Sequence, residues 1–184
     1  MNSKYKSVHL TEVLQFLEGK EENNKPFLFV NQSGNLETFF TYKGNMKDIY
    51  KMKMMLDVHP EKKEEIEKEI LACLGSGMKT PKIGSWVVFN LGENATFDVV
   101  SFLKQFSFYD KDMFKPETIH DKDFCLSHNI IKKEDNVDVF GNHGYFLIQE
   151  TFKFSFLSTC KPDEVDTLLK KNSELEFDVI IVND

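Results

Sequence analysis

The stretch PFLFVNQSGNLETFF, residues 26–40, decides how the rest of the chain is interpreted. Phe27 to Val30 form a short, continuously apolar run, which is typical of a strand buried on both faces of a sheet. The run stops at the turn-forming residues Asn31 to Gly34. Apolar residues then recur at helical spacing until Gly44. This order of strand, turn and helix predicts the beginning of an α/β unit.

The same order repeats along the chain. Further strands are predicted at residues 49–56, 86–89, 145–148, 152–159 and 177–182. Further helices are predicted at residues 11–17, 60–75, 99–106 and 165–169. Strands interleaved with helices predict a three-layer α/β domain, with a mostly parallel sheet and helices on both faces.

The length of the chain predicts one domain over residues 1–184. A chain of 184 residues with 41% hydrophobic residues and 18 Phe has enough apolar area for one well-buried core. Residues 107–144 mix charges, Asn and isolated Phe without a period. We interpret this segment as an irregular insertion into the domain.

The charge of the chain excludes two classes of partner. A formal net charge of -7 argues against binding to nucleic acid or to an anionic membrane, because both need a concentrated basic face.

No run approaches the roughly 18 to 20 apolar residues that a membrane span needs, and no apolar signal segment opens the chain. Cys73, Cys125 and Cys160 lie too far apart and are too few to suggest a disulfide framework. We therefore expect a cytoplasmic protein.

The basic residues exclude a class of mechanisms. All 23 are Lys and none is Arg, so the chain has no guanidinium for a bidentate grip on phosphate and no arginine finger. Hydrolysis of a nucleotide commonly relies on such a group together with a phosphate-loop Lys.

One segment superficially resembles a phosphate loop. Gly75 to Thr80 contain two Gly and a Lys, but Met78 stands where the motif requires Gly immediately before Lys79. The segment also follows a helix, whereas a phosphate loop joins a strand to a following helix. We interpret it as the loop that ends the helix at Gly75 and Gly77.

A cluster of metal-ligand side chains lies within the irregular segment. It consists of His120, Asp121, Asp123, Cys125 and His128. The spacing is irregular and only one thiol is present, which favours a charged surface loop over a metal site. We expect no bound metal.

Polar residues lie at or just after the ends of two later predicted strands. Glu93 stands where a hydrolase could place a carboxylate that activates water, and Ser158 stands where a side chain could sense a phosphate. Without a phosphate cradle, a solvent-facing carboxylate and a strand-end hydroxyl are the more common explanation.

Four segments taken together resemble, in order and character, the fifth AAA+ module of dynein heavy chains. They are PFLFVNQSGNLETFF, ILACLGSG, SWVVFNLGEN and FKFSFLSTCKPDEVDTLLKK. The resemblance covers roughly half of the chain, and residues 107–144 match no part of the module. It implies a P-loop-NTPase-like core that does not hydrolyse nucleotide and works structurally.

The resemblance also implies where a degenerate nucleotide site would lie. Its positions are Asn31, Gly34, Asn35, Glu37, Asn90, Glu93 and Ser158. The phosphate-loop Lys is missing, because residues 35–37 in its neighbourhood are Asn, Leu and Glu. We therefore expect no catalytic residue and no cofactor.

These observations predict a non-catalytic AAA+-like module that binds other proteins. The resemblance implies a structural subunit of a ciliary axoneme or another microtubule-based assembly. One alternative is a nucleotide sensor or small enzyme that uses Gly34, Glu93 and Ser158. Another is an adaptor that holds a peptide with residues 107–144 and orders that segment only when the partner is present.

Overall fold

A single parallel sheet organises the protein, whose computed structural model describes residues 4–18, 25–43, 45–79 and 86–184. Its strands are β1 (Lys6–His9), β2 (Phe27–Val30), β3 (Asn45–Asp48), β4 (Trp86–Asn90), β5 (Lys153–Ser158) and β6 (Asp178–Asn183). Their order across the sheet is β1-β6-β2-β5-β4-β3, and every pair is parallel.

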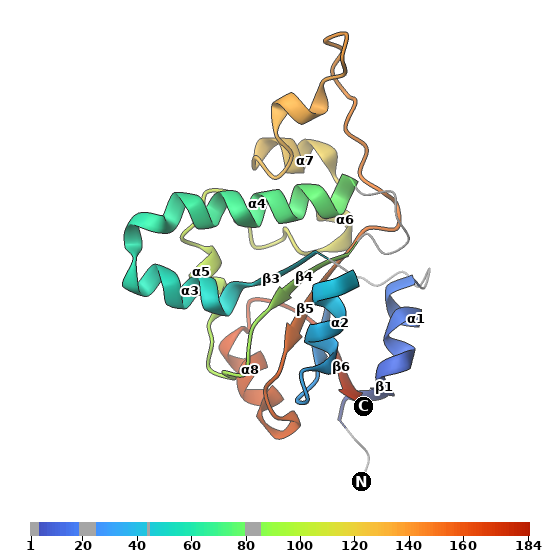
Figure 1. Cartoon of the computed structure of the whole chain (residues 1–184), viewed down its shortest axis with the longest axis vertical. Coiled ribbons are helices and arrows are strands. Elements are labelled where there is room, and N and C mark those ends of the chain that lie inside the picture. The colour runs from blue at the N-terminus through green and yellow to red at the C-terminus, as the bar shows by residue number, and fades with distance from the viewer. Residues whose placement is uncertain (1–3, 19–24, 44, 80–85) are drawn as a thin grey trace.

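Helices and short 3-10 turns connect the strands (Figure 1). The helices are α1 (Val13–Glu18), α2 (Asn35–Lys43), α3 (Ile49–Val58), α4 (Lys63–Lys79), α5 (Val99–Leu103), α6 (Pro116–Ile119), α7 (Lys122–Ser127) and α8 (Val165–Lys171). The 3-10 turns are η1 (Leu10–Glu12), η2 (Pro60–Lys62), η3 (Lys133–Asn136) and η4 (Pro162–Glu164).

Strand β2 lies in the interior of the sheet, as its sequence predicts. It pairs with β5 on one side and β6 on the other, and all four of its residues are buried. Continuous apolar character suits this position because neither face of the strand meets solvent. The predicted end of the following helix at Gly44 lies outside the described residues.

The core has two halves, one on each face of the sheet. Helices α1 and α2 cover one half, which contains Phe29, Phe40 and Trp86. Helices α3 to α8 contribute to the other half, which contains Phe89 and Phe156. The predicted three-layer α/β class with helices on both faces is therefore confirmed, and the sheet is wholly parallel.

The strand predicted at residues 49–56 is wrong, because this segment forms helix α3. The Asp48 carboxylate accepts a hydrogen bond of 2.8 Å from the amide of Lys51 and so caps the helix. Ile49, Met52 and Leu56 are buried at helical spacing, whereas Met54 of the apparent alternation is exposed. The strand in this part of the chain, β3, ends where the helix begins.

The predicted helix end at Gly75 and Gly77 is also wrong. Helix α4 continues through both residues to Lys79. A Cβ atom at Gly77 would lie 2.2 Å from Cγ2 of Val87 on β4, whereas one at Gly75 would meet only the carbonyl oxygen of Ile130 at 3.5 Å. Gly77 therefore permits the close approach of α4 to the sheet, and neither glycine ends the helix.

Alanine at these two positions is expected to have opposite effects. Gly77→Ala should lower the free energy of unfolding by about 1–2 kcal/mol, since overpacking against stiff, buried Val87 outweighs the gain in helix propensity. Gly75→Ala, the matched control, should raise it by up to about 1 kcal/mol. Urea unfolding of both variants measures the difference, and equal effects would contradict the packing role of Gly77.

Residues 107–144 contribute to the core although the sequence shows no period there. Phe114 stacks on Phe154 of β5 with ring centroids 4.6 Å apart, and Ile119 and Cys125 are buried.

The strand predicted at residues 145–148 is wrong. The amide of Tyr145 donates to the carbonyl oxygen of Asn136 and that of Phe146 to the Asn136 side chain, so both are used in the local turn rather than in pairing with a strand.

Among the described residues, no helix combines the length and the apolar character that crossing a lipid bilayer requires.

Candidate functional site

The candidate site lies where β2, β5 and β4 end. These strands are neighbours in the parallel sheet, so the loops that follow them meet at one edge. Leu36 and Phe40 of α2, which follows β2, pack on one face of the sheet. Val165 and Leu168 of α8, which follows β5, pack on the other. Ligands of doubly wound sheets commonly bind where consecutive connections diverge in this way.

The loop after β2 is closed by the side chain of Asn31, which is buried. Its Oδ1 accepts a hydrogen bond of 2.8 Å from the amide of Leu36 in the first turn of α2. Its Nδ2 donates at 3.0 Å to the carbonyl oxygen of Val182 in β6. The side chain thus ties together the ends of β2 and β6 and the beginning of α2. An amide that could face a phosphate in a working loop already has a partner.

A carboxylate lies beside the same loop. Asp184, which follows β6, accepts a hydrogen bond of 2.7 Å from the Ser33 hydroxyl and one of 3.3 Å from Asn31 Nδ2. Chiefly the bond from Ser33, followed by bonds from Asn35 and Asn31, lowers the pKa of Asp184. The carboxylate is therefore charged at neutral pH, and its charge opposes the entry of a phosphate.

Residues 35–37, the neighbourhood of the missing Lys, carry no cation. Leu36 is fully buried against the sheet, and Glu37 is half-buried in the first turn of α2. The nearby Lys51 pairs with Asp48 at 2.9 Å, and this contact raises the pKa of the lysine. Gly34 adopts a φ of 77°, which suits the turn between strand and helix.

The loop after β4 is likewise held by its own groups. Oδ1 of the buried Asn90 accepts a hydrogen bond of 2.9 Å from the amide of Gly92. Gly92 has a φ of 69°, and a Cβ there would lie 3.0 Å from the ring of Tyr50. Glu93 is exposed beyond this turn. Asn90 therefore shapes the loop rather than facing a ligand.

Ser158 joins two of the loops. Its hydroxyl donates at 2.9 Å to the carbonyl oxygen of Gly92 and accepts at 3.2 Å from the amide of Cys160. Its carbonyl oxygen accepts a hydrogen bond of 3.0 Å from the amide of Asn31. The structure thus brings the predicted positions Asn31 and Ser158 together. The hydroxyl of Ser158 is buried and is used for this internal linkage.

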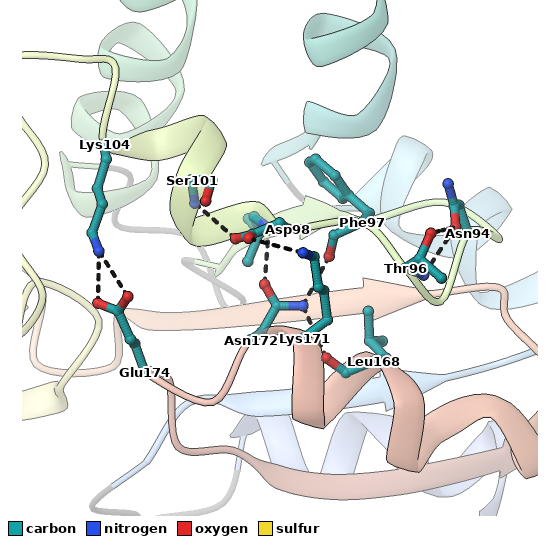
Figure 2. Close-up of polar contacts among 11 residues, drawn as sticks. Asn94, Thr96, Phe97, Asp98, Ser101, Lys104, Leu168, Lys171, Asn172 and Glu174 are labelled. Carbon is teal, nitrogen blue, oxygen red and sulfur yellow. Dashed lines mark hydrogen bonds and ion pairs between the residues drawn. The ribbon is translucent and has the colours of Figure 1, made fainter.

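Asn172, which the sequence analysis missed, fixes the segment that follows the β4 loop (Figure 2). Its Oδ1 accepts a hydrogen bond of 2.8 Å from the amide of Val99, and its Nδ2 donates at 2.9 Å to the carbonyl oxygens of Phe97 and Leu168. The side chain is buried between α5 and α8. An Asn at the end of a helical pattern carries no sequence signal for this role.

Charged contacts surround this amide at the surface. Asp98 caps α5 through the amide of Ser101 at 2.8 Å and lies 3.5 Å from Lys171. Lys104 contacts both carboxylate oxygens of Glu174 at 2.7 and 2.8 Å. Figure 2 shows both pairs flanking Asn172. They orient the loop, but their exposure limits their contribution to stability.

A surface groove of about 360 Å³ lies between α3 and α5, beside this loop. Its walls include Tyr50, Met54 and Phe102, with Asn94 and Asp98 at its polar end. Oδ1 of Asn94 accepts hydrogen bonds from the amide and hydroxyl of Thr96 at 2.9 and 2.8 Å. Asn94 and Thr96 are therefore engaged within the loop itself.

The metal-ligand side chains of the irregular segment point to different partners. His120 Nε2 lies 2.9 Å from the carbonyl oxygen of Phe152, and Asp121 caps α7. The Cys125 thiol lies 3.3 Å from the carbonyl oxygen of Ile119, and the ring of His128 stacks on Phe124. Over the part of the chain that the structure describes, no three His, Cys, Asp or Glu residues gather in a way that could hold a metal ion.

The three thiols are buried and unpaired. Burial raises the pKa of Cys73 and that of Cys125 to about 12, and it also raises the pKa of Cys160. Thiols with such pKa values stay protonated at neutral pH and are poor nucleophiles. Their role is to fill the core.

At the edge where a phosphate site would lie, polar groups of the loops after β2, β4 and β5 form hydrogen bonds with one another, and the Asp184 carboxylate lies beside the β2 loop. Comparisons with known protein families, with curated proteins and with solved structures found no match for this chain.

Proposed function

We propose that this protein is a non-catalytic, AAA+-like module that binds other proteins. The proposal combines the resemblance to the fifth AAA+ module of dynein heavy chains with the arrangement of the sheet. The degenerate loop after β2, the Asn90 to Glu93 turn after β4 and Ser158 of β5 belong to three neighbouring parallel strands. A phosphate site built from such strands would need these positions side by side.

One observation carries the non-catalytic part of the proposal. The side-chain oxygen of Asn31 accepts the hydrogen bond of the Leu36 amide in the first turn of α2, and the Asp184 carboxylate lies beside the same loop. A phosphate would have to break the bond between Asn31 Oδ1 and the Leu36 amide and to approach the Asp184 carboxylate, while the loop offers it no Lys and the chain contains no Arg. The fold is then available for its surface rather than for chemistry.

Turnover by the purified protein tests this proposal. With magnesium and either ATP or GTP, phosphate release is expected to equal that of the buffer alone, because the loop lacks the Lys and the chain lacks the Arg that such hydrolases use. The control is Glu93→Gln, which should behave identically. Magnesium-dependent turnover by the wild type that Glu93→Gln abolishes would establish a nucleotide hydrolase and overturn the proposal.

For its setting we propose a cytoplasmic structural assembly, namely a ciliary axoneme or another microtubule-based structure. The support is the resemblance to a dynein module, and the partners would be other subunits of that structure. A fluorescently tagged chain in ciliated cells of its source is expected to label the axoneme and to remain there after detergent extraction. Uniform release of the tagged chain into the detergent extract would contradict the setting and leave the non-catalytic part untouched.

A further inference from the structure

An exposed apolar turn lies outside the candidate site. Its apex is the segment 138–142, here called the tip turn, in which Val139 is 93% exposed and Phe140 is 87% exposed. Tyr145 and Leu147 on the returning segment are 63% and 70% exposed. Figure 1 shows this orange segment rising beyond α7 at one end of the longest axis of the molecule. The apolar side chains therefore stand on a convex projection.

The backbone of the tip turn is ordered by its own hydrogen bonds. Oδ1 of Asp138 accepts bonds of 2.8 Å from the amides of Phe140 and Asn142, and its Oδ2 accepts one of 2.9 Å from Asn142 Nδ2. The amide of Gly141, which has a φ of 85°, donates at 3.0 Å to the carbonyl oxygen of Asp138. Polar groups thus hold the shape of the turn, and Val139 and Phe140 are left for other contacts.

The base of the projection is fixed to the domain by Asn136. Its carbonyl oxygen accepts hydrogen bonds from the amides of Gly144 and Tyr145 at 2.9 and 3.2 Å. Its Oδ1 accepts a bond of 3.1 Å from the amide of Phe146, whose side chain is buried in the core. A loop held in this way loses little conformational entropy on binding.

We infer that the tip turn inserts Val139 and Phe140 into a concave apolar pocket of a partner protein. The inference rests on the proposed function in one respect, because both require a protein partner. Monomeric proteins rarely expose contiguous apolar patches of more than a few hundred Å² unless the patch is a binding site. Large apolar side chains that enter a pocket supply much of the affinity of small interfaces.

The size and shape of the projection favour a different protein over a second copy of this chain. Its four exposed side chains present on the order of 500 Å², since one large aromatic side chain carries about 150–250 Å². A stable dimer needs roughly 800 Å² from each partner, whereas a transient contact with another protein can be smaller. A symmetric dimer through this surface would also oppose two convex turns, which are not complementary in shape.

The charge of the protein argues against a membrane as the occupant. The net charge is -7. Next to the projection, Lys132 and Lys133 offset Glu134 and Asp135, and the tip turn itself carries the charge of Asp138 and no Lys. An anionic bilayer would repel the protein as a whole, whereas a protein pocket with a neutral or basic rim would not.

Site-specific cross-linking tests the inference. The photoreactive residue benzoylphenylalanine replaces Phe140 in one variant and Tyr42 in a control, since Tyr42 is similarly exposed on α2. Both variants are expressed in cells of the source and irradiated, and the adduct and its cross-linked residue are identified by mass spectrometry. The expected adduct is specific to position 140 and maps to an apolar pocket of one other protein.

Binding of that purified protein to this chain is then measured. Val139→Ser combined with Phe140→Ser is expected to weaken the affinity at least about tenfold, as for a loss of central apolar contacts. Tyr42→Ser should change the affinity less than about twofold. Thermal unfolding of the double variant should match that of the wild type, because both replaced side chains are exposed in the free protein.

Four results would overturn the inference: no adduct specific to position 140, an adduct to lipid, an adduct to a second copy of this chain, or an unchanged affinity of the double variant. Its failure is separable from that of the proposed function. Nucleotide turnover would refute the non-catalytic module whether or not the tip turn binds. A tip turn that binds no protein would leave the expected absence of turnover untouched.

Discussion

Asn172→Ala is expected to lower the free energy of unfolding by about 3 kcal/mol, one of the two largest effects anticipated from single substitutions. The substitution leaves the amide of Val99 and the carbonyl oxygen of Phe97 without the buried side chain that now bonds them. Each unsatisfied buried group costs about 1–3 kcal/mol. The midpoint of urea unfolding measures the loss, provided that the slope of the transition stays constant.

Lys104→Ala is the matched control for this prediction. It breaks the exposed contacts with Glu174 that flank the same segment, and a surface pair of this kind contributes at most about 1 kcal/mol. If Asn172→Ala proved as mild as Lys104→Ala, the buried amide would not be what holds the β4 loop against α8.

Asn31→Ala is expected to destabilise the protein by about 2–3 kcal/mol. The amide of Leu36 loses its acceptor, and the carbonyl oxygen of Val182 loses the donor that joins β6 to the loop. Because these bonds connect β2, α2 and β6, the first turn of α2 should also exchange its amide hydrogens faster. Urea unfolding and hydrogen exchange at Leu36 measure the two effects.

Ser33→Ala provides the comparison at the same loop. Ser33 is exposed, so losing its bond to Asp184 should change the free energy of unfolding by less than about 1 kcal/mol. Unchanged exchange at Leu36 in Asn31→Ala would mean that the Asn31 side chain does not hold the beginning of α2.

The sheet could be predicted from the sequence because its central strands are apolar without interruption. Phe27 to Val30 and the strand that begins at Trp86 have no polar face, which only a position covered on both sides explains. The segment 49–56 misled the prediction because its Met and Lys residues also alternate. The cap at Asp48 and the burial of Met52 decide in favour of a helix. Gly77 misled it too, since glycine serves close packing as well as helix ends.

The candidate site could be predicted only in part. Asn31, Asn90 and Ser158 each follow or end an apolar strand, so their meeting at one edge follows from a parallel sheet. Asp184 was missed because its contact with Ser33 depends on β6 lying beside β2, and strand order is not visible in local sequence. The exposure of Phe140 was equally hidden, because an apolar residue among charges is as compatible with burial as with a projecting turn.

Titration of magnesium-ATP into the folded protein shows directly whether the side chains of the chain itself fill the edge beside β2. If they do, the titration gives no saturable heat, and the unfolding temperature does not rise up to millimolar nucleotide. A ligand at 100 times its Kd would stabilise the folded state by about 2.7 kcal/mol, which is readily detected. Saturable binding that Gly34→Val abolishes and Tyr42→Ser leaves intact would show instead that this edge is open to nucleotide.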